Sequence, residues 1–117
     1  MHNFHKMDIW TDGIDVADMV YAVTIRFPRE EMYGLISQMQ CAAVSVPSNI
    51  AEGAGRDSNR DFCHFLNIAL GSLYELETQL VIAERRGYVD TPTFYELQTK
   101  IVSLQKRVYA FLQSIKE

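Results

Sequence analysis

The stretch LISQMQCAAVSVPSNIAEGAG, residues 35–55, decides the fold. Apolar residues recur in it at alternating steps of three and four, which places them on one face of a helix. Pro47, Asn49 and Glu52 interrupt an otherwise apolar pattern. A second stretch, FLNIALGSLYELETQL at residues 65–80, carries the same spacing without interruption. Two long helices with matching apolar seams predict a helical bundle.

Working outward, four segments carry such a seam, and no strand-like alternation of useful length competes with them. They predict helices at roughly 8–27, 29–53, 58–86 and 92–116. Short connections make neighbouring helices antiparallel, so we predict one all-α domain over residues 1–117, an antiparallel up-down-up-down four-helix bundle. The seam residues are Ile9, Gly13, Val16, Val20, Val23 and Phe27; Met32, Leu35 or Ile36, Met39, Ala43, Val46 and Ile50; Phe62, Leu66, Ala69, Leu73, Leu76, Leu80 and Ala83; and Phe94, Leu97, Ile101, Leu104, Val108, Phe111 and Ile115.

Prolines and glycines mark the expected helix ends. Pro28 disfavours the helical conformation in the residue before it, so it closes the first helix and can sit in the first turn of the second. Gly53 and Gly55 predict a left-handed cap at the end of the second helix, and Gly87 predicts the same for the third. The expected N-caps are Ser58, with Asp61 completing a capping box, and Asp90 or Thr91.

Pro47 is the exception to this local consistency. A proline in an ordinary helix interior costs about 3 kcal/mol because it removes a hydrogen bond and crowds the preceding turn. Yet the apolar register continues unbroken from Val46 to Ile50. We therefore predict a single second helix that is kinked at Pro47.

Composition limits the classes of protein that fit. The chain has 117 residues, of which 48% are hydrophobic and 22% charged, which suits one globular domain that needs no disulfide or metal. The net charge of −4 counts against a partner bound through phosphates. Cys41 and Cys63 are expected to be buried or half-buried free thiols. With no long apolar run or leader pattern, we expect a soluble cytoplasmic protein with no membrane partner.

Several predicted helices carry more apolar residues than one monomer core needs. Surplus apolar surface on long helices favours self-association, although scattered apolar residues also occur on ordinary surfaces. The additional apolar positions and their flanking residues are Trp10, Ile14 and Ala17; Phe65, Ile68, Ser72, Gln79 and Ile82; and Tyr95, Val102, Tyr109 and Leu112.

Polar residues beside the seams form the candidate site. Ser45, Asn49 and Glu52 share one flank of the second helix, and Glu77 lies near the seam of the third. One interpretation is an acid–base or metal cluster. We favour the other, a structural polar network that fixes the register between helices or subunits. A buried Glu52 or Glu77 would then need a cation, a donor or protonation.

No arrangement of residues predicts catalysis. Glu-x-x-His pairs, which mark di-iron bundles, are missing, and His64 stands alone on its helix. Neither cysteine has an evident base, and no phosphate-binding glycine loop is present. We therefore expect no enzyme and no catalytic, cofactor-binding or metal-binding residues.

Basic residues form two groupings. Arg26, Arg29, Arg85 and Arg86 are expected at one end of the bundle, and Lys100, Lys106 and Arg107 lie on the exposed side of the fourth helix. Arg56 and Arg60, which follow the second helix, are further candidate contacts for a nucleic acid. The simpler interpretation is a solvated surface. If several copies assemble, the same patches become multivalent and could contact RNA or DNA.

The strings SNIAEG, residues 48–53, and ALGSLYELE, residues 69–77, carry a resemblance that extends over nearly the whole chain. The sequence resembles the bacterial four-helix bundle family encoded in intervening sequences of 23S ribosomal RNA genes, also labelled S23 ribosomal protein. It is also similar to the accessory variability determinant of diversity-generating retroelements. The resemblance adds Glu75 to the expected polar network.

The resemblance implies a homopentameric ring. In the retroelement relative such a ring binds nucleic acid and a reverse transcriptase, whereas the role of the wider family is largely unassigned. Here Gln40 and Cys41 stand where the family usually has basic residues, and the chain is acidic. We predict a non-catalytic oligomeric scaffold or adaptor with a protein partner. The alternative is a ring that binds RNA or DNA.

Overall fold

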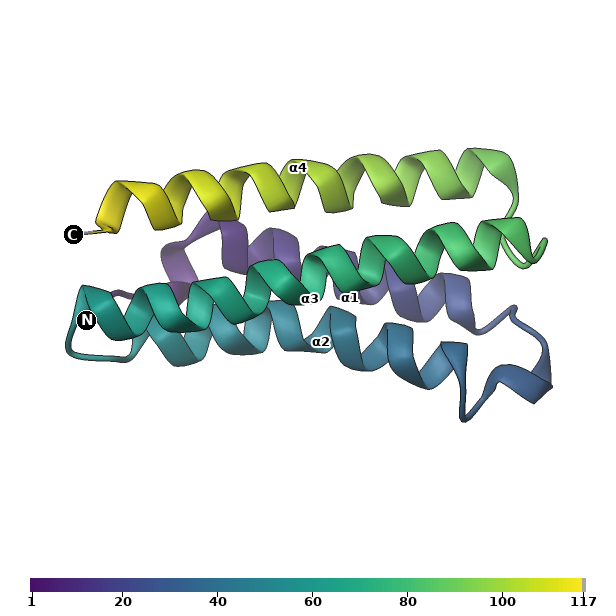
Figure 1. Ribbon diagram of the computed structural model, residues 1–117, viewed down its shortest axis with the longest axis horizontal. Helices are drawn as coiled ribbons and strands as arrows, with labels where there is room; N and C mark the ends of the chain where they lie inside the picture. The colour runs from purple at the N-terminus through teal and green to yellow at the C-terminus, as the bar shows by residue number, and fades with distance from the viewer. Residues whose placement is uncertain (117) are drawn as a thin grey trace.

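The computed structural model describes residues 1–116 and contains only helices in that range. Glu117, the last residue of the predicted domain, lies outside the described residues. The four long helices lie side by side in an elongated body of 43 × 24 × 20 Å (Figure 1). The predicted four-helix bundle is confirmed. In chain order the elements are η1 (Phe4–Lys6), α1 (Asp8–Thr24), η2 (Arg29–Glu31), α2 (Leu35–Ala54), α3 (Asn59–Arg85) and α4 (Thr91–Ile115).

The helices occupy the corners of a square. α2 packs against α1 and α3, and α4 packs against α3 and α1, whereas within residues 1–116 no Cα atoms of the diagonal pairs α1/α3 and α2/α4 come within 8 Å of each other. The face between α1 and α2 is therefore opposite the face formed by α3 and α4. Figure 1 shows α3 and α4 toward the viewer and α1 behind them.

The predicted seams form the core. Most seam residues are buried, and the central leucines of α3 and α4 are fully so. Burial of this apolar surface is the main favourable contribution to folding. The prediction that Met32 belongs to the buried seam is wrong, because 46% of its surface is exposed. Five further seam residues are only half-buried: Val23, Leu35, Ile36, Phe111 and Ile115.

The connection between α1 and α2 corrects two predicted boundaries. α1 ends at Thr24 rather than at residue 27, and the N–H of Phe27 donates to the carbonyl of Thr24 in a tighter turn. The second helix begins at Leu35 rather than at residue 29, because residues 29–31 form the separate helix η2. Gly34 breaks the helical path with φ −114° and ψ −111°. The Glu31 carboxylate then accepts from the Leu35 N–H at 3.2 Å.

Most predicted caps are observed. Ser58 accepts a hydrogen bond from the Asp61 N–H, and Asp90 accepts one from the Thr93 N–H. Gly87 takes the left-handed conformation with φ 77° and closes α3 as predicted. Gly55 does not, because its φ is −82°. The glycine-rich end of α2 therefore stops the helix without a left-handed cap.

Pro47 lies inside α2, which continues through it as one helix. The kink at Pro47 stays a prediction. Pro47 is buried against Gly13 of α1, where a side-chain carbon on Gly13 would meet the proline ring at 3.4 Å. This contact fixes α1 close to α2 near the middle of the bundle.

Candidate functional site

Two of the five predicted network residues meet between α2 and α3. The hydroxyls of Ser45 and Ser72 share a hydrogen bond of 2.9 Å. The Asn49 amide nitrogen donates to the Ser45 hydroxyl at 2.9 Å and to the Ser45 carbonyl at 2.8 Å. Ser72, which the sequence placed only in an apolar stripe, is thus the partner on α3. The contacts tie the two helices together through small polar groups that bond to one another.

Glu52 does not join this group. Its carboxylate pairs with Arg56 at 2.8 Å on the exposed end of α2, and the Arg56 guanidinium lies 4.7 Å from the centre of the Phe65 ring. Gly53 makes room for this end of α3, because a side-chain carbon there would lie 2.8 Å from Phe62 and Phe65. Glu52 therefore anchors a surface cation–π contact rather than a buried cluster.

Glu77 belongs to a third location, between α3 and α4. The Gln105 amide nitrogen donates to the Glu77 carboxylate at 2.8 Å and lies 3.5 Å from the carbonyl of Leu73. Gln105 was not predicted as a site residue. Glu75 is exposed on the outside of α3. The predicted polar residues thus make separate contacts at three places, and none of these brings two carboxylates together.

The basic residues are spread over the surface. Arg56 pairs with Glu52, and Arg107 of α4 pairs with Asp12 of α1 at 2.5 Å. Arg60, Lys100 and Lys106 are exposed. Two of the five predicted nucleic-acid contacts, Arg56 and Arg107, are thus engaged with carboxylates.

The most prominent surface feature is an apolar groove between α1 and α2. It consists of two hollows, one of about 1230 Å³ near the η2 connection and one of about 410 Å³ near η1. Both are lined by Tyr21 of α1 and Val44 of α2, so the hollows adjoin. We call this feature the α1–α2 groove; its lining includes Trp10, Ile14, Ala17, Tyr21 and Ile25 on one side and Gln40, Val44, Pro47 and Ala51 on the other.

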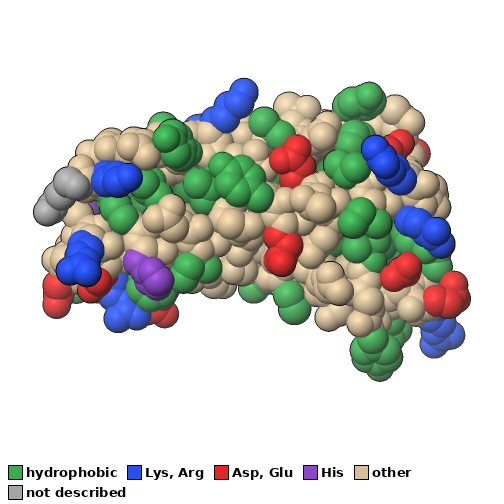
Figure 2. Space-filling view, viewed as in Figure 1, with side chains coloured by type: hydrophobic (Ala, Val, Ile, Leu, Met, Phe, Trp, Pro, Cys, Tyr) green, Lys and Arg blue, Asp and Glu red, His purple; other side chains and the backbone are tan. Residues whose placement is uncertain are grey.

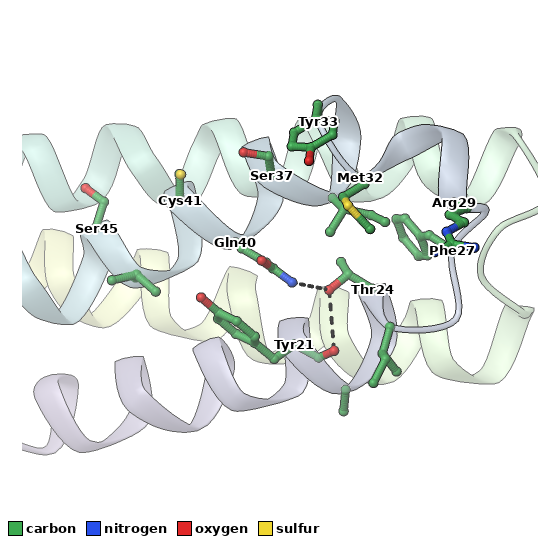
Figure 3. Close-up of a pocket in the computed structure, with 14 residues that line it drawn as sticks. Tyr21, Thr24, Phe27, Arg29, Met32, Tyr33, Ser37, Gln40, Cys41 and Ser45 are labelled. Carbon is green, nitrogen blue, oxygen red and sulfur yellow. Dashed lines mark hydrogen bonds between the residues drawn. The ribbon is translucent and has the colours of Figure 1, made fainter.

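Hydrogen bonds centred on Thr24 lie on the floor of the larger hollow. The Gln40 amide nitrogen donates to the Thr24 hydroxyl at 3.1 Å, and that hydroxyl donates to the Val20 carbonyl at 2.8 Å. Figure 3 shows Gln40 and Tyr21 reaching into the space between the two helices. Asp18 and Arg29 are the charged residues in the lining. The groove is therefore mainly apolar, with these two charges and a few small polar side chains among its lining.

Many of the exposed apolar side chains lie in the groove. Among the residues described, twelve large hydrophobic side chains are exposed, and six of them line the groove. A typical monomer rarely gathers so many on one surface without a partner. Cys41 also lines it and is exposed, which corrects the prediction of a buried or half-buried thiol. The six are Ile14, Tyr21, Ile25, Met32, Tyr33 and Val44.

Two charged groups near the α3–α4 connection have shifted pKa values. The hydrogen bond and charge of Tyr88, aided by Glu31, raise the pKa of Arg86 above its ordinary value. The hydrogen bond from the Thr93 N–H lowers the pKa of Asp90. The Tyr88 hydroxyl donates to Glu31 at 3.0 Å. These contacts cap α4 and hold this end of the bundle together.

Within residues 1–116, no three His, Cys, Asp or Glu side chains gather closely enough to hold a metal ion. In the same range, no helix combines the length and the hydropathy that crossing a bilayer requires.

Sequence reasoning missed the α1–α2 groove. It did single out Trp10, Ile14 and Ala17 as surplus apolar positions on the first helix. The matching signal on α2 was available, because Val44 lies outside the seam while remaining apolar. Tyr21, Ile25 and Val44 together would have indicated an open apolar face.

These features define an all-α four-helix bundle protein with an open apolar groove. A family model described as 23S rRNA-intervening sequence protein matches residues 5–110, and the chain belongs to this family. The resemblance to this family stated from the sequence is thereby confirmed, whereas the similarity to the accessory variability determinant stays a prediction.

A solved structure supports the same fold. It is the crystal structure of a protein of unknown function from the S23 ribosomal protein family of Bacteroides thetaiotaomicron, with a TM-score of 0.80 and 20% sequence identity. The match covers 89% of this chain and 97% of that chain. A comparison with curated protein sequences gave no match.

Proposed function

We propose that the chain is a non-catalytic, homo-oligomeric bundle that serves in the cytoplasm as a scaffold or adaptor for a macromolecular partner. The observation that carries the proposal is the α1–α2 groove, which exposes six large apolar side chains beside only two charges. Apolar surface of this kind on a rigid helical body supports binding. The resemblance to the S23 family favours five copies.

Light scattering after size exclusion tests self-association. We expect a mass near five times 13.4 kDa at micromolar concentration. A clean monomer would contradict the proposal. A different, stable number of copies would retain the oligomer and remove the pentamer.

The alternative is a ring that binds RNA or DNA. The name of the matching family, together with the exposed Arg60, Lys100 and Lys106, favours it. The net charge of −4 and the pairing of Arg56 and Arg107 with carboxylates count against it. A mobility-shift assay with RNA and with DNA at low and high salt separates the two. Binding that weakens steeply with salt would support the alternative, since released counterions produce that dependence.

A further inference from the structure

The two hollows of the α1–α2 groove repeat at a fixed interval along α2. The larger is lined by Ser37, Gln40, Cys41 and Val44, and the smaller by the residues seven positions further on. Each set follows the spacing i, i+3, i+4, i+7. The second set is Val44, Pro47, Ser48 and Ala51.

α1 repeats the pattern on the other side of the groove. Ile14, Ala17, Asp18 and Tyr21 line the smaller hollow with the same spacing, and Tyr21 and Ile25 continue into the larger. Four residues at these positions form the hole that receives one side chain from a facing helix. Seven residues span about 10.5 Å at ~1.5 Å per residue. The groove is therefore shaped for a helix with a large side chain every seven residues.

The chain carries such a helix. Tyr95, Val102 and Tyr109 are seven residues apart on the outer side of α4, where the tyrosines are 59% and 52% exposed and the valine is half-buried. We call these residues the α4 stripe. Figure 2 shows apolar side chains spread over the face that α3 and α4 form.

A second stripe of the same period fits less well. Ile68, Glu75 and Ile82 on α3 are also seven residues apart and exposed. Glu75 would place a carboxylate in an apolar hole without a partner, which is costly. The α4 stripe has no charge at any of its three positions.

We propose that the α4 stripe of a second copy of this chain occupies the α1–α2 groove. The inference rests on the proposed self-association and names its two surfaces. A tyrosine in the larger hollow can donate to the Gln40 carbonyl oxygen, because the Gln40 amide nitrogen is already bonded to Thr24. The Gln40 amide oxygen, which accepts no hydrogen bond from residues 1–116, thereby gains a donor.

Charge agrees with this arrangement. Lys106 lies between Val102 and Tyr109 along α4, and Asp18 lies in the smaller hollow. In the part of the chain that the structure describes, neither residue takes part in an ion pair. Opposite charges at the rim favour one register of the incoming helix over others.

The two surfaces lie on different helices, so the contact is head-to-tail. Each copy offers its groove to one neighbour and its stripe to another. Such contacts produce a closed ring when the rotation between copies closes and a chain when it does not.

Two variants, each with one of the two contact surfaces blocked, test the proposal by complementation. Val44→Arg blocks the groove and leaves the stripe intact. The double variant Tyr95→Arg/Tyr109→Arg blocks the stripe and leaves the groove intact. All three side chains are at least 42% exposed, so both proteins are expected to fold, which circular dichroism checks. Each protein alone should be a monomer by light scattering.

An equimolar mixture of the two variants should give a dimer, because one intact groove then meets one intact stripe. Ile68→Arg, an exposed substitution on α3, is the matched control and should retain the wild-type mass. If arginine unfolds a variant, serine at the same positions should still raise the dissociation constant at least tenfold.

Three outcomes would overturn the inference while leaving the oligomer standing: a mixture that stays monomeric, a stripe variant with the wild-type mass, or a monomeric Ile68→Arg. The second of these would indicate contact between two grooves instead. A wild-type monomer, in contrast, would overturn the proposed function itself.

Discussion

The two sides of α2 differ in how they use the same kinds of residue. Toward α3, small residues bring the backbones together, with Ser45 bonded to Ser72 and Gly53 in contact range of Phe62. Toward α1, the outer edge stays open, and Val44 is 42% exposed in the groove. One helix thus completes the core on one side and offers a surface on the other.

The connection between α1 and α2 accounts for part of the difference. Gly13 and Pro47 hold the two helices close near the middle. The larger hollow lies beyond that contact, at the end where residues 25–34 link the helices through η2. α2 and α3 are joined instead by the short turn at residues 55–58. The longer connection allows α1 and α2 to diverge at this end and leave an open face between them. The short turn holds α2 and α3 together.

The largest expected effect on stability concerns α3, which packs against the closed side of α2. Leu73 of α3 is fully buried, and Leu73→Ala removes the side-chain atoms beyond the β-carbon and leaves the space empty. We expect the free energy of unfolding to fall by about 2–5 kcal/mol, because the lost burial is joined by a cavity. Urea unfolding measures the loss in free energy, and thermal unfolding gives the melting temperature. A melting temperature within a degree of wild type would place Leu73 outside the core.

Gly53→Ala should have the next largest effect. The added methyl carbon would meet Phe62 and the first side-chain carbon of Phe65 at 2.8 Å, so α3 must shift away. Overpacking of this kind costs about 1–3 kcal/mol. Gly71→Ala on α3 is the control, because nothing lies within 4 Å of its position. If the two variants unfold alike, the close approach of α2 and α3 at this point is not real.

The Ser45–Ser72 contact should matter less. Ser45→Ala removes a hydroxyl that bonds to both Asn49 and Ser72, and we expect a loss of about 0.5–1.5 kcal/mol. A double-mutant cycle with Ser72→Ala isolates the pair. Additive losses would mean that the two hydroxyls do not stabilise each other.

The fold was largely predictable because its signal is periodic. The seams of α3 and α4 follow a regular spacing, and their leucines are buried as predicted. The start of the second helix could not be predicted in this way. Met32 continues the apolar spacing, although the backbone at Gly34 departs from the helical conformation. Apolar spacing reports which face a residue would occupy in a helix, not whether the helix has begun.

The polar residues of the candidate site were found, but not their arrangement. Ser45 and Asn49 share a flank by helical spacing, which the sequence contains. Their partner Ser72, and the partner of Glu77, Gln105, depend on how neighbouring helices are aligned along their axes. The apolar positions outside the seams, such as Val44, were visible in the sequence, but that α1 and α2 border one groove depends on the space between the two helices.

The smallest expected effect belongs to the open side. Tyr33 lines the groove near the η2 connection and is 93% exposed, so Tyr33→Ser removes an aromatic ring from water rather than from the core. We expect the free energy of unfolding to change by less than about 0.5 kcal/mol. Urea unfolding at several protein concentrations measures it, because any dependence on concentration reports association instead of monomer stability. A loss close to that of Leu73→Ala at every concentration would mean that the groove is closed within one chain, and the difference between the two sides of α2 would disappear.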